Sequence, residues 1–295
     1  MITNKIIMTR PYAFKFNEET ASDNIYQEDS NKLSDDEIQK RALEEFDSAV
    51  YLLRKNKIHV DVIEDFDDRT PDSIFPNNVF VTFPGKIFVA QMYTENRNKE
   101  YEKLLPQLKK VIDFKDVQVI NFKNDKGKVL EGTGVVVIDR WNSTAYASLS
   151  KRCDKDEFLK FADEFKLKPI YFKSKDQGSY IYHTNVMMSV SEKFTLIADE
   201  LIVENKGEVL KTLRESGKEI ISLTYNEFIN FSANSIELKG EGKNLFVISK
   251  EGYNSLSPDK IRIIEKYDEI LPIDVKNISR FGGGSIRCMI AENFI

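Results

Sequence analysis

The chain of 295 residues is long enough to bury a large core, as one big domain or as two ordinary ones. Its 41% hydrophobic and 31% charged residues are typical of a soluble globular protein, and its net charge of −5 gives no indication of a nucleic-acid or membrane partner. No secretion signal or membrane-spanning run is recognisable, and the chain has only two cysteines, so a reduced cytoplasmic protein is expected.

The N-terminal part predicts a strand, a polar loop, a helix and a second strand. Residues 5–9 are predicted to be a strand, and residues 17–31 are too poor in apolar side chains for a core element, so a loop or lid is expected there. Ser34 and the acidic residues after it are predicted to cap a helix that continues to about Lys55. His59–Ile63 alternates as a strand.

From residue 79 onward one order of elements returns: a hairpin, a helix and a strand. The predicted hairpins are 79–83/86–90, 135–139/144–149, 186–190/194–198 and 235–239/245–249, the helices lie near 98–109, 154–165, 205–215 and 258–266, and the strands near 117–122, 169–172, 219–223 and 270–273. Pairing of residues 286–290 with residues 5–9 would make a fifth hairpin, which the first helix and the His59 strand complete. The hairpin starts lie 49 to 56 residues apart, a spacing typical of radial or stacked repeats. The sequence thus predicts five units in a closed ring, with an ordinary α+β domain as the alternative.

Polar residues precede the first strand of each predicted hairpin. They are Asn77 and Asn78, Glu131 through Gly134, His183 through Asn185, Asn234, and Gly284 through Cys288. Equivalent positions of a closed ring converge on its axis. We therefore expect a carboxylate, an imidazole, a thiol and several amides at one end of a central channel.

The C-terminal stretch Gly282-Gly283-Gly284 lies four residues before Cys288. Glycines let the backbone approach a small ligand closely. A cysteine becomes a nucleophile when its thiolate is stabilised, and Arg280, Arg287 or a histidine folded onto Cys288 could provide that stabilisation. The alternative is a glycine-rich turn before a buried structural cysteine. Cys153 stands in a charged helix start and is interpreted as a structural or surface residue.

Three of these residues suit covalent catalysis. Cys288 would be the nucleophile, His183 the acid and base, and Glu131 the group that orients the imidazole. Attack on a planar carbon that carries nitrogen would expel an amine, and water would clear the adduct. The sequence has no metal motif, phosphate loop or dinucleotide fingerprint, so no metal or cofactor is expected.

Four stretches resemble the guanidino-group-modifying enzymes of the pentein superfamily, which includes arginine deiminase, dimethylarginine dimethylaminohydrolase and the amidinotransferases. They are Phe75-Pro76-Asn77-Asn78, Leu130 through Gly134, Tyr182 through Val186, and Gly282 through Met289. The segment from Ala13 to Gln27 is also similar to a branch of amidinotransferases and citrulline-utilisation hydrolases. The resemblance implies an α/β fold, the five-bladed propeller, as one catalytic domain over residues 1–295. It also implies the three catalytic roles above.

The sequence departs from arginine deiminases at Asn78 and Asn185, where those enzymes have aspartates that hold the guanidinium. Loss of these partners would weaken binding of a buried guanidinium by about 2–5 kcal/mol. A neutral ureido group loses nothing of that kind and can exchange hydrogen bonds with amides. The sequence therefore predicts a thiol hydrolase that converts citrulline to ornithine, ammonia and carbon dioxide. The expected substrate-binding residues are Asn78, Asn185, Asn234 and Gly284, with Arg280 or Arg287 at the substrate carboxylate.

Two alternatives stay open at this point. The first is a guanidino hydrolase or an amidinotransferase that acts on arginine or a methylated relative through the same chemistry. The second is a propeller that binds a partner and has lost catalysis. The substrate is expected to be a small amino acid with a ureido or guanidino group, and a homo-oligomer is compatible with the sequence.

Overall fold

The structure is a computed structural model that describes residues 2–28, 33–124 and 127–295. Within these residues the strands form five sheets of one repeated topology. In each sheet a first strand pairs antiparallel with a second, which pairs parallel with a third. The sheets are β17 (Ala291–Glu292), β1 (Lys5–Arg10) and β2 (His59–Glu64); β3 (Phe80–Phe83), β4 (Lys86–Val89) and β5 (Gln118–Asn121); β6 (Val137–Asp139), β7 (Thr144–Ser148) and β8 (Lys168–Asp176); β10 (Met188–Val190), β11 (Phe194–Ile197) and β13 (Glu219–Ser222); and β14 (Ile236–Leu238), β15 (Leu245–Ser249) and β16 (Glu269–Ile273). The third sheet also carries β12 (Ile202–Glu204) and β9 (Ser179–Tyr180).

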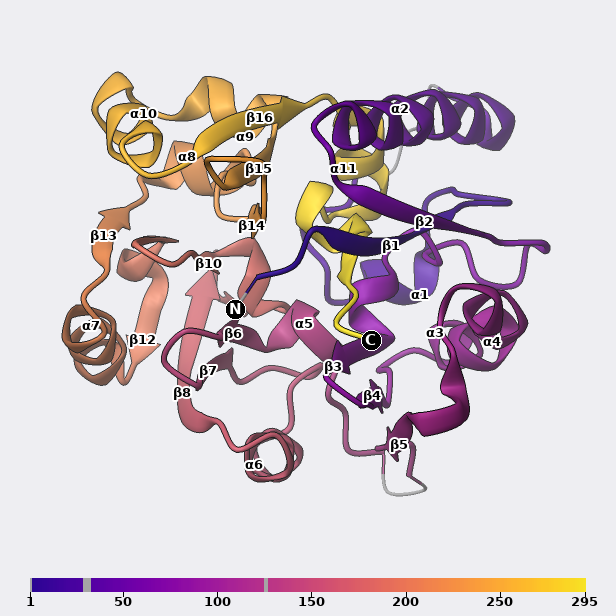
Figure 1. Cartoon of the computed structure of the whole chain (residues 1–295), viewed down its shortest axis with the longest axis horizontal. Helices are drawn as coiled ribbons and strands as arrows, with labels where there is room; N and C mark the ends of the chain where they lie inside the picture. The colour runs from indigo at the N-terminus through magenta and orange to yellow at the C-terminus, as the bar shows by residue number, and fades with distance from the viewer. Residues whose placement is uncertain (1, 29–32, 125–126) are drawn as a thin grey trace.

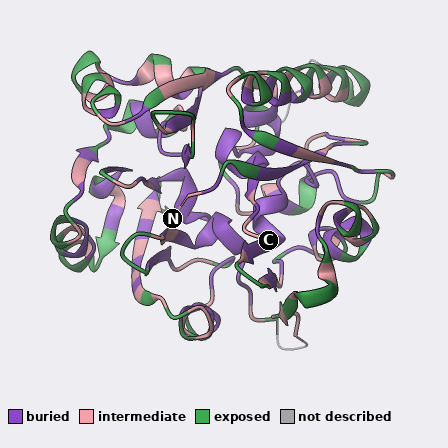
Figure 2. Ribbon diagram, in the orientation of Figure 1, coloured by how far each residue is buried: buried purple, intermediate pink, exposed green. Residues whose placement is uncertain are grey.

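A long helix connects the second strand of each sheet to the third, because parallel strands require a crossover connection. These helices are α2 (Asp35–Lys55), α4 (Glu100–Val111), α6 (Lys155–Glu164), α7 (Lys206–Glu215) and α10 (Pro258–Glu265). Figure 1 shows the five sheets arranged around a common centre with these helices at the periphery. The helices expose one face, whereas the segments at the centre are buried (Figure 2).

Shorter helices and turns connect the remaining strands. They are α1 (Glu18–Ala21), α3 (Glu95–Asn98), α5 (Gly132–Val135), α8 (Tyr225–Ile229), α9 (Lys250–Ser255), α11 (Lys276–Gly282) and the 3₁₀ turns η1 (Pro76–Asn78), η2 (Phe114–Asp116), η3 (Thr184–Val186), η4 (Asp199–Leu201) and η5 (Ile286–Met289). Helix α1 occupies part of the predicted loop 17–31, whose residues 29–31 lie outside the described residues. None of the helices in the described part of the chain is long and apolar enough to span a membrane.

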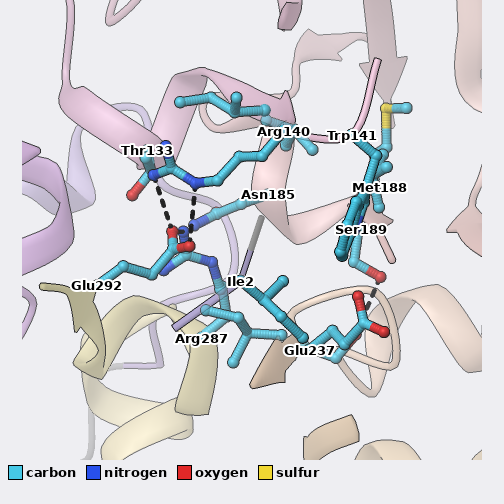
Figure 3. Close-up of a pocket in the computed structure, with 15 residues that line it drawn as sticks. Ile2, Thr133, Arg140, Trp141, Asn185, Met188, Ser189, Glu237, Arg287 and Glu292 are labelled. Atoms are coloured by element: carbon cyan, nitrogen blue, oxygen red, sulfur yellow. Dashed lines mark hydrogen bonds and ion pairs between the residues drawn. The ribbon is translucent and has the colours of Figure 1, made fainter. Parts of the chain in front are cut away.

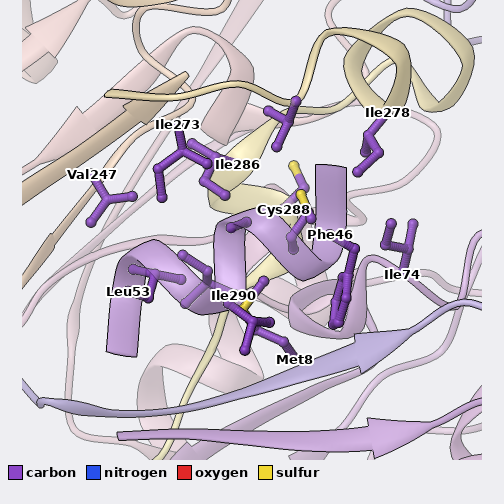
Figure 4. Packing of buried hydrophobic residues seen from close by; sticks show 14 of the residues in the cluster. Met8, Phe46, Leu53, Ile74, Val247, Ile273, Ile278, Ile286, Cys288 and Ile290 are labelled. Atoms are coloured by element: carbon purple, nitrogen blue, oxygen red, sulfur yellow. The ribbon is translucent and has the colours of Figure 1, made fainter. Parts of the chain in front are cut away.

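Helix α2 illustrates how the sequence dictates these elements. Ser34 accepts a hydrogen bond from the Glu37 N–H, and the Glu37 carboxylate accepts one from the Ser34 N–H, so both ends of a capping box are satisfied. Apolar residues at helical spacing, among them Phe46 and Leu53, form the buried face. This face packs into the hydrophobic cluster that also surrounds Cys288 (Figure 4).

The predicted order of elements within each unit is confirmed, but the predicted first strands begin too early. Val135 and Val186 belong to the helical turns α5 and η3, and Val79 is the residue that follows η1. β-Branched residues are enriched in strands, and here burial between neighbouring turns overrides that preference. The same positions that looked like strand starts are therefore turns.

The largest correction concerns residues 286–290, which were predicted to pair with β1. They form the turn η5, in which the Cys288 N–H donates to the Ser285 carbonyl oxygen at 2.9 Å. The pairing with β1 is made further along by β17, where Ala291 lies opposite Ile7. The turn directs the Cys288 side chain into the centre of the molecule instead of leaving it on an alternating strand.

Candidate active site

The turns that precede the first strands meet at the centre of the molecule. Turn η1 contacts both α5 and η5, and α5 also contacts η3. Glycines permit this approach: Gly132 has φ +44°, and a Cβ there would collide with the Asn77 carbonyl oxygen. A Cβ at Gly134 would lie 2.8 Å from the His183 imidazole. Side chains at these positions would push the turns apart.

Glu131 and His183 form a buried hydrogen-bonded pair. His183 Nε2 lies 2.7 Å from Glu131 Oε2, and Glu131 Oε1 accepts the Tyr93 N–H at 2.8 Å. Burial alone would raise the pKa of Glu131, but the Arg152 charge and the His183 hydrogen bond lower it to about 2. Because an ionised carboxylate only accepts, Nε2 carries the proton and Nδ1 is the basic nitrogen.

The His183 imidazole is neutral at physiological pH. Burial lowers its pKa to about 4, although the hydrogen bond to Glu131 acts in the opposite direction. A neutral imidazole with one free nitrogen can accept a proton and return it, as a general acid and base must. Glu131 fixes the tautomer that leaves this nitrogen available.

Cys288 is buried, and two amides hold its sulfur. Asn234 Nδ2 lies 3.2 Å and Asn185 Nδ2 3.4 Å from Cys288 Sγ. Burial raises the pKa of the Cys288 thiol, while the Asn234 hydrogen bond and the Arg287 charge lower it. A Cβ at Gly284 would lie 3.1 Å from the sulfur, so the glycine leaves space beside it. The thiol is protonated in the resting protein and is surrounded by groups that stabilise its anion.

Cys288 and His183 line one pocket of about 250 Å³. Gly282 and Gly284 of the predicted glycine stretch also line it. Several of its other residues were not predicted from the sequence to bind substrate: Thr20, Asn24, Asp72, Phe75, Arg97, Arg152 and Tyr182. Asn78, which was predicted, lines it too. The pocket therefore places a thiol, a basic imidazole and an amide around one small volume.

Two polar atoms of the pocket residues have no hydrogen-bond partner within the described residues. They are Asn78 Nδ2 and Asp72 Oδ1. Asn78 Oδ1 is occupied, because Arg97 Nη1 donates to it at 3.0 Å. Asp72 Oδ2 accepts from Asn17 Nδ2 at 2.8 Å. Buried polar groups are nearly always paired, so an unpaired amide N–H and an unpaired carboxylate oxygen indicate where a polar ligand binds.

Two buried arginines complete the wall of the pocket. Arg97 forms a two-point ion pair with Glu100, at 2.8 and 3.0 Å. Arg152 pairs with Asp23, and its guanidinium lies 4.7 Å from the Tyr182 ring centre. In the sequence both arginines stand in ordinary charged stretches, so no local pattern distinguishes them from surface residues.

The N-terminal segment of the described chain helps to hold the glycine stretch. Asn24 Nδ2 donates to the Gly282 carbonyl oxygen at 3.4 Å, and Gln27 Nε2 donates to the Phe281 carbonyl oxygen at 3.1 Å. Thr20 and Asn24 also line the pocket. The described part of the predicted lid thus lies against the pocket and contacts the loop that carries Cys288.

Four predicted substrate residues do not line this pocket: Asn185 and Asn234 hold the Cys288 sulfur instead, and Arg280 and Arg287 lie elsewhere. Arg280 is on the surface, where its Nε lies 2.5 Å from Glu28 Oε2 and its side chain is 44% exposed. Arg287 lies within the turn η5, and its side chain points away from the pocket. Its Nη1 donates to the Ile290 carbonyl oxygen at 2.7 Å. Both arginines were assigned to the substrate because they are close to Cys288 in the sequence. In the structure, helix α11 directs Arg280 and turn η5 directs Arg287 away from the pocket.

A protein-family model described as N,N dimethylarginine dimethylhydrolase, eukaryotic, matches residues 10–295. The chain belongs to this family. The pentein superfamily indicated by the four sequence motifs is thereby confirmed, and the protein is an enzyme that acts on non-peptide C–N bonds. The family comprises arginine and dimethylarginine hydrolases, so it supports the guanidino alternative more directly than citrulline.

Solved structures agree with this assignment at the level of the fold. The N-terminal domain of ArgZ, an arginine dihydrolase of cyanobacteria, superimposes with TM-score 0.75 and 16% identity over 98% of this chain and 97% of that one. Unliganded AgrE gives TM-score 0.77 and 16% identity over 98% of this chain and 39% of that one. A dimethylarginine dimethylaminohydrolase adduct with S-methyl-L-thiocitrulline gives 0.68 and 15% over 99% and 100%. No curated protein matched the sequence. These likenesses confirm the predicted α/β class.

Proposed function

We propose that the protein is a cysteine-dependent hydrolase that cleaves the ureido C–N bond of citrulline. The observation that carries the proposal is the orientation of Asn78. Arg97 occupies the oxygen of this amide, so the amide presents an N–H donor to the pocket. A ureido group has a carbonyl oxygen that accepts such a donor, whereas a guanidinium has only donors to offer. The unpaired oxygen of Asp72 can in turn accept a ureido N–H.

The proposed reaction begins with transfer of the Cys288 proton to His183 Nδ1. The sulfur forms a bond to the ureido carbon, and His183 returns the proton to the ornithine nitrogen as its bond to that carbon breaks. This leaves ornithine and an S-carbamoyl cysteine. Water then attacks the carbamoyl carbon, restores the thiol and releases carbamate, which decomposes to ammonia and carbon dioxide.

The proposed site also suits the other end of an amino acid. Arg152 lines the same pocket as Cys288 and is buried, whereas Arg97 binds Asn78 at the head-group end. Buried guanidiniums bind carboxylates strongly. We place the substrate carboxylate on the Arg152 side of the pocket. The same proposal takes the five sheets as blades of a closed five-bladed propeller with the site at its centre.

A second candidate is a guanidino hydrolase that acts on arginine or a methylated arginine. The family match favours it, and so does Asp72, whose carboxylate could pair with a guanidinium. Burial raises the pKa of Asp72 and the charge of Arg97 opposes this, so a cationic ligand would favour the ionised form. In the first candidate the Asn78 amide selects a ureido group, and in the second the Asp72 carboxylate selects a guanidinium.

A substrate comparison tests the proposal. Purified protein would be incubated with citrulline, arginine and dimethylarginine, and ornithine, citrulline, ammonia and methylamines would be quantified, with and without an added acceptor amine. We expect ornithine from citrulline and at most slow turnover of the guanidines. Brisk turnover of arginine or dimethylarginine without turnover of citrulline would select the second candidate, and a transferred amidino group would indicate an amidinotransferase.

The variant Asn78→Asp sharpens the comparison. A carboxylate at this position only accepts hydrogen bonds, so it removes the donor to a ureido oxygen and adds a partner for a guanidinium. We expect the ratio of kcat/KM for arginine to that for citrulline to rise by roughly tenfold or more, the effect of one hydrogen bond to a charged group. An unchanged ratio would mean that Asn78 does not contact the head group.

A further inference from the structure

A second cavity lies beside the turns that carry the catalytic residues. It has about 560 Å³ of space, part of which is open to solvent, and it shares no lining residue with the Cys288 pocket. Arg287 lines this cavity whereas its neighbour Cys288 lines the other, and Asn185 lines it whereas His183 lines the other. The turns η3 and η5 therefore separate two pockets. Figure 3 shows this second cavity, which we call the Arg287 cavity.

The Arg287 cavity contains two guanidiniums that share one carboxylate. Arg140 Nε lies 3.2 Å from Glu292 Oε1, and Arg287 Nη2 lies 3.3 Å from Glu292 Oε2 (Figure 3). The three side chains are each between 11% and 12% exposed, so water screens them poorly. Two guanidiniums and one carboxylate give these three side chains a net charge of about +1.

The carboxylate on the other wall does not supply that partner. Glu237 Oε2 accepts the Glu192 N–H at 2.8 Å, and Glu237 Oε1 accepts from Asn244 Nδ2 at 3.1 Å. Burial also raises the pKa of Glu237, which disfavours its ionised form. The other lining residues include the apolar side chains of Trp141, Met188 and Ile236.

We propose that the Arg287 cavity binds a small organic carboxylate with an apolar body, and that its occupation slows the chemistry of Cys288. The carboxylate would lie beside Glu292 and accept hydrogen bonds from the guanidinium N–H groups of Arg140 and Arg287 that Glu292 does not use, since each guanidinium carries five such donors. The apolar body would contact Trp141, Met188 and Ile236. This site is distinct from the substrate pocket, and its binding function does not depend on which substrate the enzyme hydrolyses.

Two contacts connect the cavity with Cys288. The positive charge of Arg287 stabilises the Cys288 thiolate, and an anion on Arg287 would cancel that charge. Asn185, whose amide donates to Cys288 Sγ, also lines the cavity. An occupant therefore acts on the sulfur without entering the catalytic pocket. This regulatory effect rests on Cys288 being the nucleophile of the proposed function.

The chain offers a direct probe, because Trp141 is its single tryptophan and lines this cavity. Benzoate would be titrated into the full-length protein while tryptophan fluorescence is recorded, with benzamide as the uncharged control of the same shape. We expect a saturable change with benzoate and none with benzamide. The variant Arg140→Gln should weaken the benzoate affinity by about tenfold or more, the effect of one hydrogen bond to a charged group.

Alkylation of Cys288 by iodoacetamide would measure the connection without any substrate. Benzoate should slow the alkylation severalfold, with the same half-saturating concentration as the fluorescence change in the wild type and in Arg140→Gln. No saturable fluorescence change, or an equal change with benzamide, would overturn the site. Saturation with an unchanged alkylation rate would overturn the regulation. The fluorescence and alkylation measurements on the wild type test the proposal even if the variant does not fold. Neither measurement depends on the substrate of the enzyme.

Discussion

The two cysteines of the chain lie in similarly buried places and differ in what surrounds their sulfur atoms. Cys153 and Cys288 are each 2% exposed, and burial raises the pKa of both thiols. At Cys153 the nearby charges of Asp154 and Glu131 raise the pKa further. At Cys288 the amides of Asn234 and Asn185 and the charge of Arg287 lower it.

The difference shows that exposure alone does not distinguish the two cysteines of this protein. Both sulfurs are inaccessible by surface area, but only Cys288 has donors and a cation that stabilise a thiolate and a basic imidazole on the wall of the same pocket. Removal of these groups should make the Cys288 thiol as unreactive as that of Cys153. The variants below change the sulfur or its surroundings, in order of decreasing expected effect.

Replacement of the sulfur itself should have the largest effect. We expect Cys288→Ala to lower kcat by at least roughly a thousandfold, because the covalent route is lost. Cys153→Ala should retain turnover and lower the free energy of unfolding by about 1 kcal/mol, because it removes a buried sulfur. Steady-state kinetics and chemical denaturation of both variants check this. An inactive but folded Cys153→Ala would contradict the comparison.

Displacement of the imidazole should have the next largest effect. A Cβ in Gly134→Ala would lie 2.8 Å from the His183 ring and collide with the Asn78 amide. A shift of about 1 Å in a catalytic group can lower the rate roughly a hundredfold, and we expect a loss of that order in kcat/KM. Gly207→Ala in α7 is the matched control, because a Cβ there meets nothing within 4 Å. Comparable losses in both variants would mean that space beside His183 is not the cause.

The buried imidazole should also make stability depend on pH. The pKa of His183 is about 4 in the folded state, below its ordinary value of 6.5, so the unfolded state binds more protons in between. Stability should therefore fall as the pH falls from 6.5 towards 4, by about 2 kcal/mol at about pH 5. Chemical denaturation at several pH values measures this slope.

The variant His183→Gln should remove this contribution to the slope, and His59→Gln, at the exposed start of β2, is its control. The Glu131 carboxylate affects the free energy of unfolding at lower pH than His183 does. Its folded pKa of about 2 lies below the ordinary 4.5, so its contribution is present above 4.5 and is lost as the pH falls through that range. An unchanged slope in His183→Gln between pH 6.5 and 4 would show that the imidazole is not buried in its neutral form.

The smallest effect is expected when one donor to the sulfur is removed. Asn234→Ala takes away an N–H that stabilises the Cys288 thiolate, so the thiol pKa should rise and alkylation by iodoacetamide at neutral pH should slow by about tenfold. Asn234→Asp keeps an acceptor for the Ser285 N–H but places a negative charge beside the sulfur, and should slow alkylation further. Asn226→Ala on α8 is the control and should alkylate at the wild-type rate. Equal rates in all four proteins would show that the amide does not tune the thiol.

Much of the fold could be predicted from the sequence because each unit consists of local features. A hairpin and a crossover helix produce alternating and helical patterns within about fifty residues, and the caps of α2 are visible as Ser34 and Glu37. The starts of the first strands were missed because Val135 and Val186 favour strands by themselves. Only their burial between neighbouring turns makes them helical, and a local pattern does not contain that information.

Site residues that stand at equivalent positions of the repeated units could be predicted from the sequence, and the other site residues could not. Glu131, His183 and Cys288 stand at equivalent positions of their units, and the turns at these positions contact one another at the centre of the molecule. Asp72 and Arg97 lie outside that register and reach the pocket through contacts between distant segments. Arg287 was assigned to the substrate by its place next to Cys288, but consecutive residues of a 3₁₀ turn point to different sides.

The pairing of β1 with β17 imposes an order of events on the newly made protein. Strand β1 is synthesised near the beginning of the chain, yet Cys288 and the antiparallel partner of β1, which begins at Ala291, are synthesised at its other end. Contacts of such long sequence separation form late in folding. Until residues 284–292 have emerged from the ribosome, the sheet of β17, β1 and β2 is incomplete and Cys288 is missing from the pocket. On the proposed function, the protein is therefore inactive during its own synthesis.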